Sequence, residues 1–350
     1  MNIERYSLTK DYSISRVING CWQLSDGHSL GNKLDFKDIL NAFTQLVEKG
    51  FTTFDCADIY TGTEEFLGDF STQLKTHSSL RSEDIQIHTK YVPDVNKLSN
   101  LKFEDTEAII DRSLKRLKRD TLDMVQFHWW DYNIEGFVET AMDLETLKKK
   151  GKIRNISVTN FDEKHLSKIV DAGVDIVSCQ SQYSVIERRV EKGFLDYCTG
   201  KNITQICYGT ISGGLISDKY LGMSKATAAE TRSQVKYLQV IEESIGWDAF
   251  QELLNILKKI AAKYNASISN IASRYILEKK AIAAIIIGTR SSRHIESNQK
   301  IFELKLSEAD MKMIDEFLIK QPILAGQPYE LERNDSKFKG IIKMDLNKKP

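Results

Sequence analysis

The ten residues FTTFDCADIY (51–60) decide the fold, because a β-branched, apolar run ends there in two side chains that can titrate, Asp55 and Tyr60. Lys90 ends a second run of this kind, and His128 ends a third. If these runs are parallel strands joined by helices, their carboxyl ends meet at one edge of the sheet. The acid, the phenol, the amine and the imidazole are therefore predicted to share one site.

Outward from this stretch, short strand-like runs alternate with longer segments of helical period along the chain. The eight predicted strands are 17–18, 51–56, 85–90, 122–128, 153–159, 176–180, 203–208 and 282–287. Predicted helices between or after them include 36–49, 103–119, 134–150, 191–200 and 307–319. Asp35 and Asp162 are expected to cap helix N-termini, whereas Gly50 and Gly151 follow helix C-termini.

Strict alternation of strands and helices predicts a parallel sheet, and eight units in about 300 residues match a (β/α)8 TIM barrel. A doubly wound sheet is the alternative, but no G-x-G-x-x-G motif follows the first strand. Residues 5–15 are predicted to form an N-terminal β-hairpin that plugs the barrel, and 307–319 an extra C-terminal helix. We expect a single barrel domain over 1–350, with its core at 17–318, a polar insertion at 222–246 and a loop-like tail at 320–350.

The bulk composition narrows the function classes. The 350 residues carry 49 basic and 49 acidic side chains without a basic stripe, so no nucleic-acid partner is expected. The longest apolar run, 281–287, is too short to cross a bilayer, and the first residues lack the apolar stretch of a secretory signal. Five scattered cysteines indicate a reducing, cytoplasmic location and no metal site.

Each residue of the predicted site also has a structural interpretation. Asp55 could cap a helix, Tyr60 and Lys90 could be solvated surface groups, and His128 could be a hydrogen-bonded core histidine. These interpretations would all have to hold at equivalent positions of successive strands, which favours one shared site.

The chemistry of the four groups fits proton transfer. A Lys90 ammonium held by Asp55 favours the phenolate of Tyr60 and is expected to lower its pKa. Tyr60 could then give a proton to a developing alkoxide, a contribution on the order of 10²–10⁴-fold. Such a site reduces a carbonyl only with a hydride donor that the protein lacks, which implies a nicotinamide coenzyme.

With these residues in view, the chain resembles the aldo-keto reductases from about residue 17 to 318. The catalytic blocks of that family match FDCADIY (54–60), IHTK (87–90) and VQFHWWD (125–131). Its coenzyme blocks match VTNF (158–161), QSQY (180–183) and IIGTRSSRHIESN (286–298).

The resemblance implies a catalytic tetrad of Asp55, Tyr60, Lys90 and His128, with Tyr60 as proton donor and His128 orienting the carbonyl. It implies that the carboxamide, the nicotinamide face, the pyrophosphate and the adenosine phosphate are bound by residues spread over the rim. These coenzyme-binding residues are Gly20, Trp22, Asp55, Thr159, Asn160, Gln180, Tyr208, Gly209, Thr210, Ile211, Gly213, Leu215, Gly288, Thr289, Arg290, Ser292, His294 and Asn298.

The sequence departs from the family pattern at three places. Thr159 replaces a serine, Gly209-Thr210 replaces Ser-Pro, and His294 stands where many members carry an arginine for the 2′-phosphate. Arg290 could serve instead, so NADPH is favoured and NADH stays open.

The predicted function is reduction of an aldehyde or ketone, a small-molecule carbonyl substrate, to an alcohol by an NAD(P)H-dependent oxidoreductase. Two alternatives remain: a redox-sensing nucleotide-binding subunit like the potassium-channel β subunits, or a sugar-alcohol dehydrogenase working in the oxidative direction. Candidates for the substrate pocket are Trp22, Tyr91, Trp129, Trp130 and the insertion. The sequence leaves the substrate and the oligomeric state undetermined.

Overall fold

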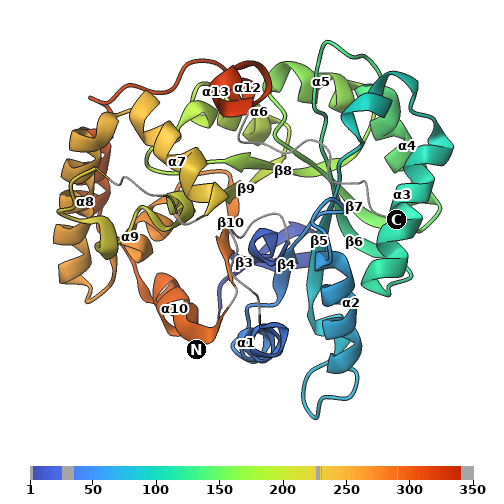
Figure 1. Cartoon of the computed structure of the whole chain (residues 1–350), viewed down its shortest axis with the longest axis horizontal. Coiled ribbons are helices and arrows are strands. Elements are labelled where there is room, and N and C mark those ends of the chain that lie inside the picture. Colours follow the sequence, from blue (N-terminus) through green and yellow to red (C-terminus); the bar gives the residue numbers. More distant parts are fainter. Residues whose placement is uncertain (1–2, 26–34, 226–228, 230, 290, 340–350) are drawn as a thin grey trace.

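Eight parallel strands close into a barrel with the order β10-β3-β4-β5-β6-β7-β8-β9 (Figure 1). The structure, a computed structural model, describes residues 3–25, 35–225, 229, 231–289 and 291–339. The closed ring confirms the predicted barrel, and it excludes the doubly wound sheet because such a sheet is open at two edges. The barrel strands are β3 (Val17–Gly20), β4 (Thr53–Asp55), β5 (Gln86–Tyr91), β6 (Leu122–Phe127), β7 (Ile153–Thr159), β8 (Ile176–Gln182), β9 (Thr204–Tyr208) and β10 (Ile282–Gly288).

Helices surround the barrel and follow its strands in the chain (Figure 1). They are α1 (Phe36–Glu48), α2 (Thr63–Leu74), α3 (Phe103–Leu117), α4 (Phe137–Lys149), α5 (Glu163–Asp171), α6 (Phe194–Gly200), α7 (Arg232–Glu243), α8 (Gly246–Lys263), α9 (Ile268–Leu277), α10 (Ile295–Glu303), α11 (Glu308–Leu318), α12 (Glu330–Asn334) and α13 (Ser336–Lys339). None of the helices in the described part of the chain has the length and hydropathy needed to cross a membrane.

The helices begin and end at the capping residues predicted from the sequence. Asp35 accepts hydrogen bonds from two backbone N–H groups at the start of α1, and Asp162 accepts one from His165 at the start of α5. Gly50 and Gly151 adopt positive φ after α1 and α4, where a side chain would be strained. The predicted caps are confirmed.

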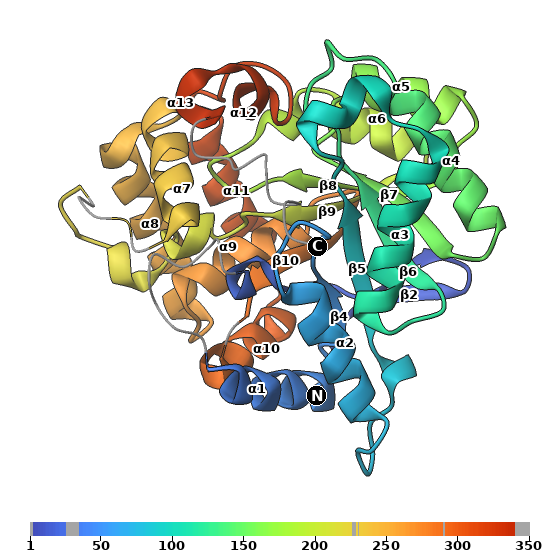
Figure 2. The ribbon, with the colours of Figure 1, turned by 45° about the vertical axis from the view of Figure 1, so that its right-hand side comes forward.

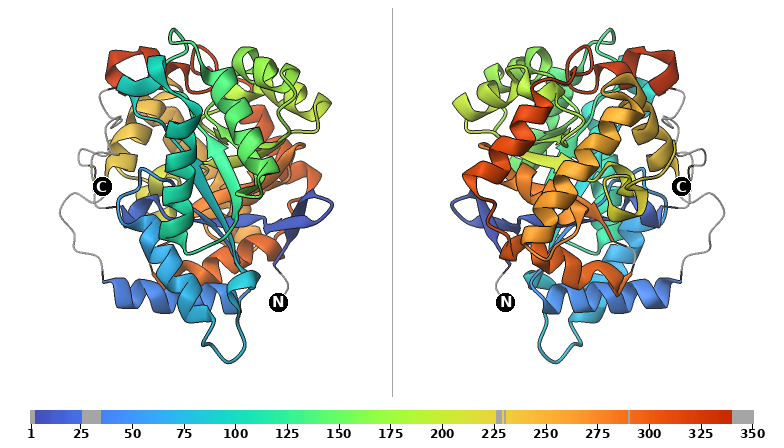
Figure 3. Two further views of the ribbon diagram at one scale, coloured as in Figure 1. Left: turned by 90° about the vertical axis from the view of Figure 1, so that its right-hand side faces the viewer. Right: turned by 90° about the vertical axis from the view of Figure 1, so that its left-hand side faces the viewer.

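The N-terminal hairpin closes one end of the barrel. Strands β1 (Arg5–Thr9) and β2 (Tyr12–Ser15) pair antiparallel, and Tyr12 and Ile14 are buried against interior residues such as Ile18 and Met124. Figure 3 shows the hairpin and the α12–α13 segment at opposite ends of the barrel. The predicted plug is confirmed, and the other end is left for a site.

The insertion and the tail cover that other end. The polar insertion contains α7, and residues 330–339, expected to be loop-like, instead form α12 and α13. The expectation fails there because non-local contacts, the ion pairs of Glu332 in α12 and the burial of Phe338 in α13, stabilise helices too short to stand alone. Figure 2 shows α12 beside α7, and Glu332 of α12 pairs with Lys236 of α7 at 3.2 Å. Residues 340–350 of the predicted tail lie outside the described residues.

The strand register brings the polar strand ends to one level. Asp55 of β4 is the partner of Gly20 on one side and of His88 on the other, and Thr159 of β7 is the partner of Gln180 on β8. Because neighbouring strands end together, their last side chains share the same rim of the barrel.

Candidate active site

A buried ion pair lies at the centre of the rim. Lys90 Nζ donates to Asp55 Oδ2 at 2.6 Å and to the backbone carbonyl of Cys56 at 2.9 Å. Both side chains are almost fully buried. Burial alone would lower the pKa of Lys90, but the attraction of Asp55 and Tyr60 and the hydrogen bond to Asp55 together outweigh burial and raise this pKa above its usual range. The amine therefore stays charged at every ordinary pH.

Two glutamines hold the second oxygen of this carboxylate. Gln126 Nε2 and Gln180 Nε2 each donate to Asp55 Oδ1 at 2.7 Å, and Gln180 Nε2 also donates to Gln126 Oε1 at 2.6 Å. A buried carboxylate that is paired and hydrogen-bonded on both oxygens cannot turn. The network thus fixes where the Lys90 ammonium lies.

The Tyr60 phenol lies over this ammonium. Lys90 Nζ is 5.2 Å from the centroid of the Tyr60 ring, and the Trp22 ring covers Tyr60 with its centroid 4.7 Å away. Burial raises the pKa of Tyr60 to about 12, although the charge of Lys90 acts in the opposite direction. The expected net lowering of this pKa is therefore outweighed by burial, and the phenol is protonated at neutral pH.

His128 sits directly beyond β6 as a neutral imidazole. Burial, and then the positive charge of Arg333, lower its pKa to about 3. Its Nδ1 lies 3.2 Å from the carbonyl oxygen of Thr159, so Nδ1 carries the hydrogen of the neutral ring if the two are bonded. Nε2 is buried and has no hydrogen-bond partner among the described residues.

This tautomer changes what His128 can do. With the hydrogen on Nδ1, Nε2 presents a lone pair and accepts a hydrogen bond from a hydroxyl group. Orienting a carbonyl oxygen, as expected from the sequence, requires the opposite tautomer, in which the lone pair of Nδ1 would face the oxygen of Thr159.

An amide pair complements the tetrad on the neighbouring strands. Asn160 Oδ1 accepts from the Tyr208 hydroxyl at 2.8 Å, which leaves Asn160 Nδ2 without a hydrogen bond to any described residue. Gln180 Oε1 likewise accepts no hydrogen bond from any described residue, since both hydrogen bonds of this side chain are donated by its Nε2. One donor and one acceptor therefore remain, the combination that a primary carboxamide needs.

All these groups line one cavity of about 820 Å³, which extends from the rim towards α10. The tetrad residues Asp55, Tyr60, Lys90 and His128 all border it. The predicted coenzyme-binding residues that border it are Gly20, Trp22, Asp55, Thr159, Asn160, Gln180, Tyr208, Gly209, Thr210, Ile211, Gly213, Gly288, Thr289, His294 and Asn298.

Some predicted residues lie elsewhere. Leu215 is buried in the apolar core, and Ser292 is exposed and not among the described residues that line the cavity. Arg290 lies outside the described residues. Tyr91 and Trp129, both suggested for the substrate pocket, are fully buried, whereas Trp22 and Trp130 border the cavity.

Comparison of the sequence with known proteins identifies the family of this chain. The profile of the Aldo/keto reductase family matches residues 16–319. The chain belongs to the Aldo/keto reductase family. It is 24% identical over 333 residues to the NADH-specific methylglyoxal reductase of Escherichia coli (strain K12), covering 88% of this chain and 96% of that protein. It is 27% identical over 269 residues to the glyoxal reductase of Bacillus subtilis (strain 168), covering 77% of this chain and 79% of that protein.

Solved structures share the fold. A glycerol dehydrogenase from Gluconobacter oxydans superposes with a TM-score of 0.76 at 21% identity, covering 90% of this chain and 95% of that chain. A thermostable aldo-keto reductase in complex with the inhibitor epalrestat gives a TM-score of 0.71 at 24% identity, covering 90% and 100%.

This aldo/keto reductase has features that suit the nicotinamide coenzymes of its family. The amide pair complements a carboxamide, and the Tyr208 ring beside it is fixed through its hydroxyl. At the far end of the cavity, Arg293 and His294 are exposed next to the start of α10. An anionic phosphate is favoured at such a helix start.

Sequence reasoning missed several residues of the site. Gln126 could have been found, because Met124 and Gln126 of β6 and His128 just beyond it are two residues apart and therefore face the barrel interior. Arg293, Lys236 and Tyr329 also border the cavity. Lys236 and Tyr329 come from the insertion and the tail, where no periodic pattern in the sequence indicates which way a side chain points.

Proposed function

We propose that this aldo/keto reductase transfers hydride from NAD(P)H to an aldehyde or ketone, with Tyr60 protonating the carbonyl oxygen. The observation that carries the proposal is the buried Asp55–Lys90 pair beneath the Tyr60 phenol. A fixed cation at this point stabilises negative charge as it develops on the phenol oxygen.

The roles of the other residues follow from the same geometry. Asn160 Nδ2 and Gln180 Oε1 would hold the carboxamide of the coenzyme, and Tyr208 would lie on the nicotinamide ring. The bound coenzyme supplies the hydride that the protein lacks. Tyr60 gives its proton to the oxygen that gains charge, and Lys90 offsets the charge left on the phenolate. His128 would accept a hydrogen bond from the newly formed hydroxyl.

The residues around the tetrad favour small or aromatic carbonyl compounds as substrates. Trp22, Trp130 and Tyr329 provide aromatic surface around the tetrad. The named relatives reduce methylglyoxal and glyoxal, which makes small dicarbonyls the first compounds to assay.

We propose NADPH as the preferred coenzyme because Arg293 offers a cationic group, and His294 an imidazole, where a 2′-phosphate would lie. The NADH-specific relative shows that family membership leaves this preference open. Among the described residues no feature favours the channel-subunit or the sugar-alcohol alternative over carbonyl reduction.

The decisive experiment compares wild type and Tyr60→Phe with a panel of aldehydes, ketones and sugars, followed by the absorbance of NADPH and of NADH. We expect turnover to fall about 10²–10⁴-fold or more in the variant, because the proton donor is lost. Coenzyme binding, measured by quenching of tryptophan fluorescence, should remain within about twofold. Unchanged turnover in Tyr60→Phe would refute the assignment.

A further inference from the structure

Arg333 of α12 reaches the active-site rim from the far end of the chain. Its side chain is buried, with 6% of the residue exposed. Nε and Nη2 donate to the carbonyl oxygen of Trp129 at 3.3 and 3.0 Å, and Nη2 also donates to the carbonyl oxygen of Asn160 at 2.8 Å. One guanidinium group therefore bridges the chain segments that follow β6 and β7.

These two carbonyls belong to the residues that directly follow His128 and Thr159. Just beneath the bridge, His128 Nδ1 contacts the carbonyl oxygen of Thr159. Asn160 itself has a φ of 63°, a left-handed conformation that residues with a side chain seldom adopt, although asparagine tolerates it best. Its N–H donates to Gln180 at 2.9 Å, so the Arg333 bond fixes the other side of the same residue.

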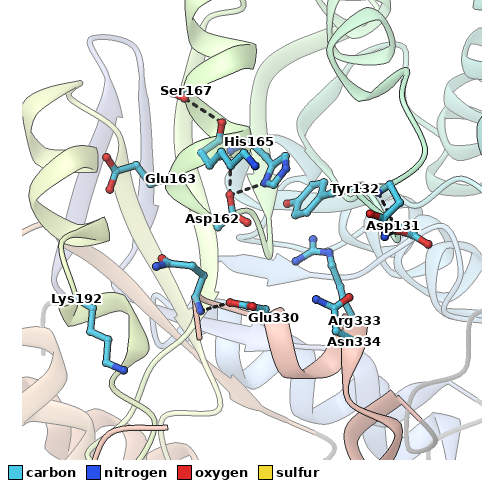
Figure 4. Close-up of a pocket in the computed structure, with 13 residues that line it drawn as sticks. Asp131, Tyr132, Asp162, Glu163, His165, Ser167, Lys192, Glu330, Arg333 and Asn334 are labelled. Carbon is cyan, nitrogen blue, oxygen red and sulfur yellow. Dashed lines mark hydrogen bonds and ion pairs between the residues drawn. The ribbon is translucent and has the colours of Figure 1, made fainter. Parts of the chain in front are cut away.

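The guanidinium plane is held by aromatic rings. Arg333 lies 4.1 Å from the centroid of Tyr132, and Tyr132 stacks on His165 with centroids 3.5 Å apart (Figure 4). His165 is held in turn by Asp162, at 2.6 Å. Tyr132, His165, Asp162 and Arg333 itself border a second, surface cavity, so the stack forms part of the wall of that cavity.

The environment of Arg333 differs from that of a purely structural arginine nearby. Arg189 is paired with two carboxylates, Glu187 at 2.8 Å and Glu332 at 3.1 Å. Arg333 forms no ion pair with any described residue, and its hydrogen bonds go to rim carbonyls instead. Its positive charge also helps to keep His128 neutral, as the lowered pKa of that residue reflects.

We propose that Arg333 is a positioning residue, which holds the backbone of Asn160 so that its side-chain amide meets the nicotinamide carboxamide. The inference rests on the proposed function, because it assumes that Asn160 contacts the coenzyme. Arg333 would act only on the nicotinamide half of the dinucleotide, since the adenosine half would lie towards Arg293 and His294 at the start of α10.

The test compares two ligands on Arg333→Met, which keeps the length of the side chain but removes its donors and charge. NADPH carries the nicotinamide, whereas 2′-phospho-ADP-ribose lacks it. We expect the dissociation constant of NADPH to rise about tenfold, as for the loss of one good hydrogen-bonded contact, while that of 2′-phospho-ADP-ribose stays unchanged. Arg333→Lys should recover part of the loss, because one ammonium cannot reach both carbonyls as the guanidinium fork does.

Glu330→Gln is the matched control in the same helix, because its carboxylate accepts from the backbone of Gln327 in the same segment. This variant should bind both ligands as wild type does. Equal weakening of both ligands in Arg333→Met, or weakening of neither, would overturn the proposal. The proposed function fails separately, if wild type does not bind NADPH or NADH or if Tyr60→Phe keeps its turnover.

Discussion

At the scale of single residues, burial acts in opposite directions on Tyr60 and His128 and leaves both uncharged. It raises the pKa of the phenol to about 12 and lowers that of the imidazole to about 3. A proton donor works only below its pKa, so reduction should persist until Tyr60 begins to ionise. His128 should acquire charge only in strong acid.

We therefore expect the hydride-transfer rate constant, measured in single turnovers, to be flat between about pH 6 and pH 10 and to fall above that range. Lys90 limits the rise in the pKa of Tyr60, so Lys90→Met should raise this pKa further and create no inflection near neutral pH. The variant should lose most of the activity, because no cation is left to offset the charge of the phenolate. An inflection between pH 6 and pH 8 in the wild-type profile, with substrate saturating, would contradict this picture of the site.

The meeting of Asp55, Tyr60, Lys90 and His128 at one rim was predictable, because they lie at or just beyond strand ends, and strand ends in a parallel barrel share a rim. Gln126 needed one more step, the two-residue alternation of β6. The tautomer of His128 could not be predicted, since it depends on a carbonyl oxygen of the neighbouring strand β7 at 3.2 Å. Proton positions follow from non-local contacts that sequence patterns do not carry.

At the scale of elements, α12 is held to the barrel by buried charges in addition to the apolar packing of Leu331. The buried Glu332 carboxylate pairs with Arg189 at 3.1 Å and with Lys236 at 3.2 Å. Burial raises the pKa of Glu332, but these two cations outweigh that effect and lower it. No periodic pattern predicts α12, because the helix is short and its partners are distant in the chain.

Removing the charge of Glu332 should release this element. Breaking a buried ion pair from one side costs about 3–5 kcal/mol, because the partner charges stay buried. We expect Glu332→Gln to speed amide hydrogen exchange and proteolysis across 324–339, and to raise KM for the carbonyl substrate because Tyr329 borders the cavity. Lys337→Ala removes only an exposed pair with Glu243 and should change neither measurement. Wild-type exchange rates in Glu332→Gln would show that the ion pairs of Glu332 do not hold α12 in place.

At the scale of the whole molecule, the interior of the barrel changes from apolar to polar along its axis. Tyr12 and Ile14 of the plug meet Met124 at one end, and the Tyr12 hydroxyl lies 3.1 Å from His88 Nε2 further in. Lys90, two residues after His88 in β5, lies at the opposite rim. The end closed by the hairpin therefore contributes to stability, and the opposite end carries the chemistry, as is usual for this barrel architecture.

This division predicts that a cavity in the plug weakens folding but not catalysis. Ile14→Ala removes a fully buried side chain and should lower the free energy of unfolding by about 2–5 kcal/mol, measured by urea denaturation. At a temperature well below its unfolding transition, the variant should keep the wild-type kcat/KM, because Ile14 lies beneath the layers that carry the tetrad. Lys10→Ala, in the exposed hairpin turn, is the control for the hairpin itself. A loss of kcat/KM in Ile14→Ala without a loss of stability would contradict this division, because it would mean that the two ends of the barrel are coupled through its interior.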